Sequence, residues 1–289
     1  MNRRTLLKSL PLAMAPALPA AAAASKKSRL RTAICAYSYR DPLGKKTMTY
    51  RDIVDIAVDT GVDGLDLTVY WFPSTGKDFL LPLKRHAFTN GVEIYSISVR
   101  SDMCRPTAEE RAKEFASLKN WIDVAATLGA GHIRVFGGAV PKGRTEDEAS
   151  EWVVETLGMS AMYAATEGVI LGLENHGGIT ARADTIKKIV TKVNSPWVGV
   201  NVDTGNFESD AYSQLTTIIP YAVNVQVKTE IRVEKGKNEP SDWDRVAKML
   251  VESGYKGYLA LEYEAREDPI KAMPGLLAKL NAVARKYSA

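Results

Sequence analysis

Short apolar runs alternate with longer amphipathic stretches along the chain from Arg29 to its end. The apolar runs are rich in Val, Ile, Leu or Tyr, and several follow a glycine, which is typical of strands entered through a turn. This pattern predicts strands over 31–37, 63–69, 93–99, 132–137, 169–175, 198–203, 222–228 and 257–263.

The stretches between these runs carry apolar residues at helical spacing. They predict helices over 49–60, 80–90, 107–129, 145–167, 180–193, 211–219, 241–253 and 269–287. The helix over 107–129 has the clearest start, because Thr107 is followed three residues later by Glu110, as in a capping box. Ser241 or Asp242 is placed to cap the helix over 241–253.

Strict alternation of strands and helices indicates parallel strands joined by crossover helices. Eight such units in residues 29–289 match a closed (β/α)8 TIM barrel, which typically needs about 250 residues. We therefore predict a single α/β barrel domain. The first turn lacks the G-x-G-x-x-G pattern of a dinucleotide site, which argues against an open doubly wound sheet.

Polar residues occupy alternate positions near the ends of the later predicted strands, while Val and Leu occupy the positions between them. Because side chains alternate between the two faces of a strand, the polar set should point into the barrel at its C-terminal mouth, where barrel enzymes carry out their chemistry. These polar positions are Arg134, Glu174, His176, Asp203, Gln226, Lys228 and Glu262.

Three carboxylates that meet in one cavity need protons or a cation. Glu174, Asp203 and Glu262 are oxygen donors, and Gln226 can add an amide oxygen, so the set indicates a divalent metal site. Lys228 could balance the remaining negative charge. The alternative is a set of buried ion pairs, such as Lys228 with Glu262, that holds no metal.

Four motifs at these strand ends are similar to those of the xylose-isomerase-like superfamily of sugar isomerases and epimerases. They are Leu-Glu-Asn-His at 173–176, Val-Asp-Thr-Gly-Asn at 202–206, Val-Gln-Val-Lys at 225–228 and Gly-Tyr-Leu-Ala-Leu-Glu-Tyr-Glu at 257–264. The resemblance covers about 29–288. It implies one Mn²⁺ or Mg²⁺ ion, with Glu174, Asp203, Gln226 and Glu262 as ligands. Gln226 stands where many members have His, a departure that favours a hard cation over zinc.

The resemblance also implies a metal-dependent isomerase or epimerase that moves a proton beside a carbonyl, through an enediolate, on a free sugar or sugar derivative. Glu174 and Glu262 would be the catalytic acid and base. His176, Lys228 and Arg134 are placed to hydrogen-bond the substrate. Aromatic rings suit the C–H faces of sugars, and Tyr70 and Trp71 follow the second predicted strand directly.

The first residues have the order of a secretory signal. Arg3 and Arg4 precede an apolar, alanine-rich stretch that ends in small residues near Ala24. We interpret 1–24 as a signal peptide that resembles the bacterial twin-arginine type, and 25–28 as a short linker. The mature protein should then be periplasmic or otherwise exported, without a membrane anchor.

Composition excludes several classes of protein. Removing the three leader cations Arg3, Arg4 and Lys8 lowers the formal net charge from +4 to +1, and no basic stripe indicates nucleic-acid binding. With two Cys and three His, the chain cannot build a disulfide framework or a histidine-rich multi-zinc centre.

The expected partner is therefore a small-molecule carbohydrate, and a homo-oligomer is compatible with the sequence. Two other functions remain open. A 3-keto-glycoside lyase or hydrolase would use the same metal and base, and a sugar-binding barrel would have lost turnover.

Overall fold

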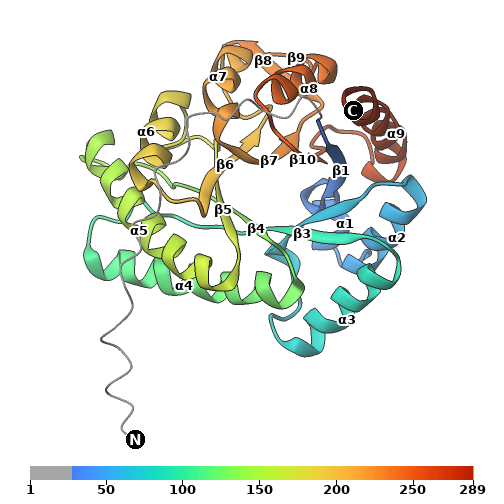
Figure 1. The fold of residues 1–289 in the computed structure, drawn as a ribbon, viewed down its shortest axis with the longest axis horizontal. Helices are drawn as coiled ribbons and strands as arrows, with labels where there is room; N and C mark the ends of the chain where they lie inside the picture. Colours follow the sequence, from blue (N-terminus) through green and yellow to red (C-terminus); the bar gives the residue numbers. More distant parts are fainter. Residues whose placement is uncertain (1–27, 289) are drawn as a thin grey trace, which may run out of the picture.

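The structure is a computed structural model that describes residues 28–288, so the predicted signal peptide lies outside the described residues. The described chain forms a closed parallel barrel with helices around it (Figure 1). This confirms the predicted (β/α)8 barrel. Around the barrel the strands are β1 (Leu30–Cys35), β10 (Gly257–Leu261), β7 (Ala222–Val227), β6 (Val198–Asp203), β5 (Ile170–Glu174), β4 (His132–Val135), β3 (Glu93–Ser98) and β2 (Gly64–Thr68).

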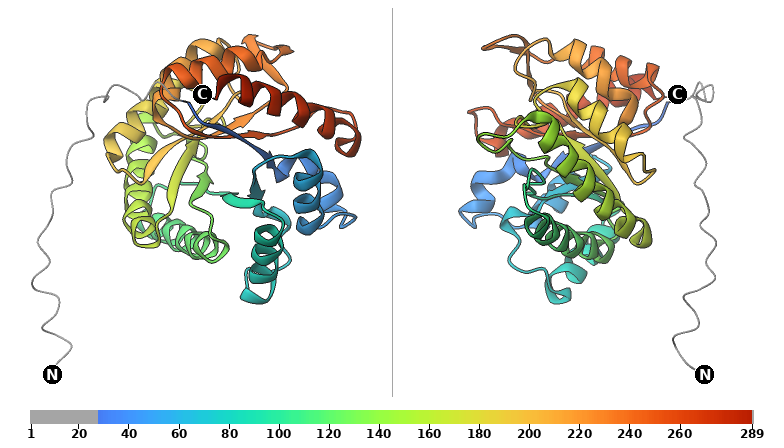
Figure 2. Two further views of the ribbon diagram at one scale, coloured as in Figure 1. Left: turned by 45° about the vertical axis from the view of Figure 1, so that its right-hand side comes forward. Right: turned by 90° about the vertical axis from the view of Figure 1, so that its left-hand side faces the viewer.

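Helices form the outer layer (Figure 2). They are α1 (Arg40–Gly44), α2 (Tyr50–Thr60), α3 (Lys77–Thr89), α4 (Ala108–Leu128), α5 (Glu146–Glu167), α6 (Ala183–Val193), α7 (Ala211–Ile218), α8 (Trp243–Glu252) and α9 (Pro269–Tyr287), with 3₁₀ turns η1 (Ala36–Tyr39), η2 (Val69–Trp71) and η3 (Ile219–Tyr221). Among residues 28–288, no helix is long and apolar enough to cross a bilayer.

An antiparallel hairpin is the main element that the sequence pattern did not predict. Strands β8 (Glu230–Glu234) and β9 (Lys237–Pro240) pair with each other between β7 and α8. The hairpin belongs to the loop that follows a barrel strand, and such loops surround the mouth of the barrel. It is therefore part of the rim beside the predicted site.

Helix ends follow directly from local chemistry. α2, α4 and α5 each begin with a capping box, in which a Thr side chain and an acidic side chain satisfy free backbone N–H groups. Each ends at a glycine with positive φ, which turns the chain toward the next strand. The pairs are Thr49 with Gly61, Thr107 with Gly129, and Thr145 with Gly168. The predicted box at Thr107 and Glu110 is confirmed, and Asp242 caps α8.

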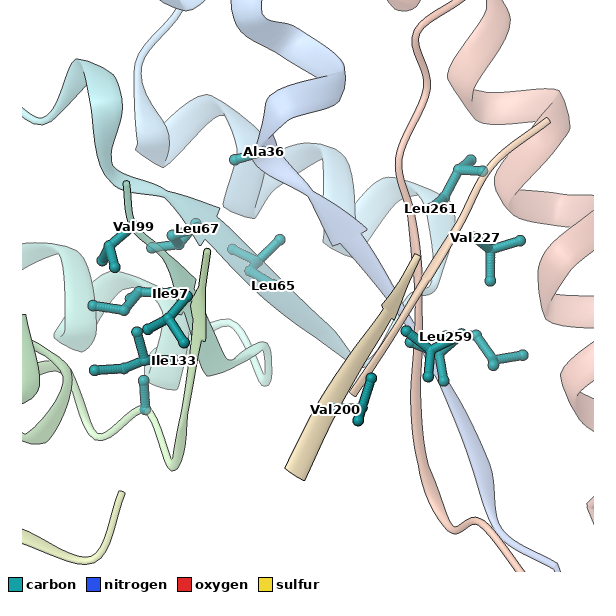
Figure 3. Packing of buried hydrophobic residues seen from close by; sticks show 14 of the residues in the cluster. Ala36, Leu65, Leu67, Ile97, Val99, Ile133, Val200, Val227, Leu259 and Leu261 are labelled. Atoms are coloured by element: carbon teal, nitrogen blue, oxygen red, sulfur yellow. The ribbon is translucent and has the colours of Figure 1, made fainter. Parts of the chain in front are cut away.

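The main apolar core lies between the strands and the helices. Ile97 and Ile133 on one side of the barrel, and Val227 and Leu261 on another, point outward from their strands (Figure 3). Burial of such side chains contributes roughly 1.5–3 kcal/mol each. This packing explains why Val and Leu alternate with polar residues along the strands.

The inside of the barrel is polar above a floor of two stacked tyrosines. The rings of Tyr95 and Tyr258 lie 3.6 Å apart, and the Tyr95 hydroxyl donates to Asn224 Oδ1 at 2.9 Å. Asn224 Nδ2 donates to Asn201 Oδ1 at 2.8 Å, and Asn201 Nδ2 donates to Gln226 Oε1 at 2.7 Å. Barrel interiors are commonly filled by branched apolar side chains. Here a chain of hydrogen bonds leads from the floor toward the mouth.

His132 completes one side of this interior. Its Nδ1 lies 2.8 Å from Ser96 Oγ, and Ser96 Oγ donates to Asp66 Oδ1 at 3.0 Å. Since the single hydroxyl proton of Ser96 goes to Asp66, the Nδ1–H of His132 is the donor to Ser96. Gly172 leaves room for the ring, because a Cβ there would lie 2.3 Å from His132 Nε2.

Candidate functional site

Three carboxylates come together at the C-terminal mouth, as the strand pattern predicts. Glu174 is the last residue of β5, Asp203 is the last of β6, and Glu262 follows β10 directly. All three are buried, with Asp203 fully covered. Each comes from a different strand of the closed barrel, so the fold itself sets their spacing.

Lys228, directly after β7, lies among these acids. Its Nζ is 3.0 Å from Glu262 Oε2 and 3.4 Å from Asp203 Oδ2, and it also contacts Glu264. The Lys228 side chain is about 10% exposed. The ion pair of Lys228 with Glu262, which the sequence analysis gave as the alternative to a metal site, is therefore present, and the ammonium balances part of the negative charge at the mouth.

Arg134 is the second buried cation of the site. Its Nε lies 2.8 Å from Glu174 Oε2, and its Nη1 donates to Val99 O at 2.9 Å and to the Tyr70 hydroxyl at 3.1 Å. Its guanidinium also lies 4.1 Å from the centre of the Phe136 ring. These contacts fix Arg134 in one orientation against Glu174.

The electrostatic environments of the carboxyl groups differ. Burial, together with the charges of Asp203 and Glu262, raises the pKa of Glu174 well above its ordinary value, although Arg134 opposes the shift. Burial and the charge of Glu262 raise the pKa of Asp203 to about 8, against the effect of Lys228. Burial also acts to raise the pKa of Glu262, but Lys228 and Arg134 outweigh it and lower that pKa. Glu262 is thus the carboxylate most strongly held in its ionised form.

The donor set suits a hard divalent cation. Glu174 Oε2 and Asp203 Oδ2 are buried oxygens whose partners are cations: Arg134 Nε lies 2.8 Å from the first, and Lys228 Nζ lies 3.4 Å from the second. With Glu262 they supply the oxygen ligands that Mg²⁺ and Mn²⁺ prefer. Within residues 28–288, however, no three acidic, His or Cys side chains are arranged to hold a metal. The ammonium of Lys228 lies between Asp203 and Glu262 instead.

Gln226 on β7 pairs in register with Asp203 on β6, but its amide is bonded to other residues. Its Oε1 accepts a hydrogen bond from Asn201 at 2.7 Å, and its Nε2 donates to Asp66 Oδ2 at 3.0 Å. Both ends of the amide are therefore engaged in the polar interior. In this arrangement Gln226 connects the floor of the barrel to the site, and its oxygen is not presented to a metal beside Asp203.

The remaining predicted residues divide between two cavities. A mouth cavity of about 130 Å³ is lined by several rings, including those of His176 and Tyr70, by three cations and by three glutamates, namely Arg100, Arg134, Lys228, Glu174, Glu262 and Glu264. His176 packs against Phe136, with ring centres 3.9 Å apart. Trp71 lines an outer groove of about 720 Å³ between η2, α2 and α3, and Tyr70 lines both this groove and the mouth cavity. The structure thus places Tyr70, but not Trp71, at the site.

Two residues of the mouth cavity escaped the sequence analysis. Arg100 follows β3 and lies over the Tyr70 ring, 4.5 Å from its centre. Asn206 donates from Nδ2 to Glu174 Oε1 at 2.9 Å. Asn206 ends the Val-Asp-Thr-Gly-Asn motif, and the turn begins where Gly205 N donates to Asp203 Oδ1 at 2.8 Å. The turn could have identified Asn206 as a site residue from the sequence. Strand alternation could not, because it applies only to residues within a strand.

The sequence matches the family described as xylose isomerase-like TIM barrel over residues 54–281. The chain belongs to this family. No curated protein sequence matches it significantly.

Several solved structures share the fold of this family member at low sequence identity. D-psicose 3-epimerase from Clostridium cellulolyticum H10, solved with D-tagatose, is 17% identical over 89% of this chain and 98% of its own, with a TM-score of 0.69. The 3-keto-D-glucoside 4-epimerase from E. coli is 17% identical over 89% of this chain and 100% of its own, with a TM-score of 0.67.

A further member of the same fold was solved with a metal. This xylose isomerase-like TIM barrel protein from Mycobacterium smegmatis, in complex with magnesium, is 17% identical over 89% of this chain and 96% of its own, with a TM-score of 0.68. At these identities the likeness establishes the fold.

Proposed function

We propose that this protein is an isomerase or epimerase that moves a proton next to a carbonyl group of a non-phosphorylated sugar or sugar derivative. The observation that carries the proposal is the meeting of Glu174, Glu262, Arg134 and Lys228 at one small buried cavity. Proton transfer beside a carbonyl needs a positioned acid and base and a positive environment for the anion that forms. The cavity supplies both.

The chain's own residues divide this work between two sides of the cavity. Glu262 and Glu174 lie on strands separated by β6 and β7, so a sugar carbon between them would meet a carboxyl group on each side. We assign Glu262 as the base in one direction and Glu174 as the matching acid. The charged groups of Arg134 and Lys228 stabilise negative charge on the substrate oxygens.

Several neighbouring groups would orient the substrate. The Tyr70 hydroxyl accepts a hydrogen bond from Arg134, and its ring together with the Phe136–His176 pair offers apolar surface to C–H groups. His176 is exposed at the entrance, where it can hydrogen-bond a sugar hydroxyl. The closed barrel beneath the mouth excludes water from the side opposite the entrance.

We also propose that one Mn²⁺ or Mg²⁺ ion binds here, held by Glu174, Asp203 and Glu262, with Gln226 as a fourth ligand once its amide turns toward them. The two buried carboxylate oxygens Glu174 Oε2 and Asp203 Oδ2, which contact only cations as ionic partners, support this site. When bound, the ion would supply positive charge to the substrate oxygens. Lys228 would then have to move away from Asp203.

The experiment that tests the function is incubation of the metal-supplemented protein in D₂O with a panel of free ketoses and aldoses and of 3-keto-glycosides, followed by ¹H NMR. Exchange of a substrate hydrogen together with an isomer or epimer as product is the expected result. Elimination of a leaving group would identify the second candidate, a 3-keto-glycoside lyase, which a second polar cavity beside the mouth favours. Saturable binding without hydrogen exchange would identify a sugar-binding barrel and contradict both enzymes.

We further propose that residues 1–24 direct export by the twin-arginine route, because Arg3 and Arg4 precede the alanine-rich stretch. Replacing both arginines by lysine should keep the protein inside the cell. Amino-terminal sequencing of the exported form should begin near residue 25, and an exported form that still begins at Met1 would contradict cleavage.

A further inference from the structure

A second cavity adjoins the mouth cavity. It has a volume of about 210 Å³, against about 130 Å³ for the mouth cavity. The two cavities share three lining residues, Asn206, Lys228 and Glu264. Because the shared residues include Lys228, which contacts Glu262, a molecule that spans both cavities would have one part at the catalytic carboxylates and another part outside them.

The β8–β9 hairpin forms the outer wall of this second cavity, which we call the hairpin cavity. Arg232 Nε donates to Asn238 Oδ1 at 2.9 Å across the hairpin, and Asn238 Nδ2 donates to Glu230 Oε2 at 2.8 Å. These bonds hold three polar side chains of the wall in place. The hairpin lies in the loop after a barrel strand, the part of this fold that most often determines substrate choice.

Gly205 brings the base of the hairpin close to the site. A Cβ at this position would lie 2.7 Å from Lys228 Cγ and 2.8 Å from Glu230 O. Only a residue without a side chain allows β8 to begin beside the turn that carries Asn206. The close approach of the backbone at Gly205 and Glu230 therefore keeps the two cavities next to each other.

The lining of the hairpin cavity suits a neutral group with many hydroxyls. The two cations of the lining, Lys228 and Arg232, are matched by the two acids Glu230 and Glu264. No aromatic residue lines the cavity. A phosphate group would meet the two carboxylates, and a flat apolar group would find no ring to stack on. Amide, carboxylate and guanidinium groups together can donate to and accept from sugar hydroxyls.

We propose that the hairpin cavity binds a second sugar unit, so that the substrate is a disaccharide or another glycoside with a second polyhydroxylated unit rather than a free monosaccharide. The reacting unit lies in the mouth cavity between Glu174 and Glu262. The linkage passes Asn206 and Lys228, and the second unit contacts Arg232 and Asn238. This inference rests on the proposed function, because it assigns the mouth cavity to the reacting sugar.

The test compares substrates of two sizes in wild-type protein and in hairpin variants. The probes are 3-ketoglucose and the 3-keto forms of α- and β-linked glucosyl disaccharides. The variants are Arg232→Ala and Asn238→Ala, and Lys235→Ala is the matched control, since Lys235 is an exposed hairpin residue that does not line the cavity. Turnover is measured as KM and kcat, and binding is measured by saturation-transfer NMR.

We expect at least one disaccharide to have a lower KM than 3-ketoglucose. Each hairpin variant should raise that KM by about three- to tenfold, the effect of losing one hydrogen bond. The KM for 3-ketoglucose and all constants of Lys235→Ala should stay unchanged. Circular dichroism should show an intact fold in each variant.

Three other results would overturn the inference, and they differ in what else they reject. Equal KM values for the two substrate sizes, with hairpin variants that behave as wild type, would reject the second sugar unit but leave the proposed function in place. Absence of both turnover and NMR-detected binding for every sugar would reject the proposed function as well. A preference for a phosphorylated sugar would also reject the neutral occupant.

Discussion

Lys228 Nζ lies 3.0 Å from Glu262 Oε2, which makes a buried ion pair at the centre of the site. The same ammonium lies 3.4 Å from Asp203 Oδ2. One lysine therefore compensates two strand-end carboxylates in an environment with little water. In such a place the loss of Lys228 leaves a buried negative charge with Arg134 as the other cation that acts on it.

Lys228→Met should destabilise the protein by about 3–5 kcal/mol at neutral pH, the usual cost of removing one partner of a buried ion pair. Urea denaturation followed by circular dichroism gives the change in unfolding free energy. Mn²⁺ at millimolar concentration should restore more stability to Lys228→Met than it adds to wild type, because the ion can take the place of the ammonium. Lys237→Met, at an exposed ion pair, serves as control and should change stability by less than about 1 kcal/mol. Equal responses to Mn²⁺ in the two variants would contradict competition for one place.

Gln226 has a structural role that can be separated from metal binding. Gln226→Leu leaves Asp66 Oδ2 and Asn201 Nδ2 without their partner, so it should cost about 1–3 kcal/mol of stability even in the presence of a chelator. Thermal unfolding in EDTA measures this loss. If Gln226→Leu were as stable as wild type in EDTA, the internal hydrogen-bond chain would not be a stabilising feature.

Asp203→Ala tests the proposed metal site. The increase in Tm that we expect Mn²⁺ to give in wild type should be abolished in this variant.

The acid and base can be separated from the ligands by Glu→Gln substitution, which keeps the shape and one oxygen donor. Glu174→Gln and Glu262→Gln should each lower kcat by roughly 10²–10⁴-fold, the usual contribution of a positioned acid or base. ¹H NMR in D₂O measures both turnover and hydrogen exchange, and a metal count is made alongside. An epimerase should lose turnover in both variants. One variant can still exchange the substrate hydrogen with D₂O on the face of the sugar carbon that the remaining glutamate serves. Full activity in both would leave His176 and Lys228 as the candidates.

His132 should make the protein sensitive to acid. Burial lowers the pKa of His132 to about 3, and Arg134 contributes to the same shift. Because this pKa is below that of an unfolded histidine, about 6.5, the unfolded state takes up the proton first as the pH falls. The stabilising contribution is complete above pH ~6.5 and declines below it by up to ~1.4 kcal/mol per pH unit.

The measurement is the unfolding free energy of wild type and His132→Asn between pH 7 and pH 4. Asn keeps a donor toward Ser96 but does not titrate. The difference between the two proteins should shift in favour of the variant as the pH falls. Parallel curves for the two proteins would show that His132 does not titrate on unfolding.

Alternation of residue types predicted the barrel and the faces of its strands, because a strand places successive side chains on opposite sides. It therefore identified Glu174, Asp203, Lys228 and Glu262 as neighbours. It did not predict the hairpin, since β8 and β9 carry mostly charged residues and pair only with each other. Lys77 also begins α3 three residues before the predicted start, where Gly76 gave no capping signal.

The strand pattern could not predict which partners an inward-facing side chain bonds or which cavity it lines. Gln226 is on the predicted inward face, but its amide turns toward Asn201 and Asp66, which come from other strands. Tyr70 and Trp71 are adjacent in the 3₁₀ turn η2 and both line the outer groove, yet only Tyr70 also lines the mouth cavity. Such choices depend on contacts between segments far apart in the chain.

The two ends of the described chain meet at the start of the barrel. Leu30 N donates to Ser288 Oγ at 2.9 Å, and Ser28 hydrogen-bonds the backbone of Tyr287. Strands begin at this end, and Glu174, Asp203 and Glu262 lie at the other. A solid support attached beside Ser28 or Ser288 would leave the mouth cavity open. The barrel can thus be immobilised through this end while a small molecule reaches the opposite face.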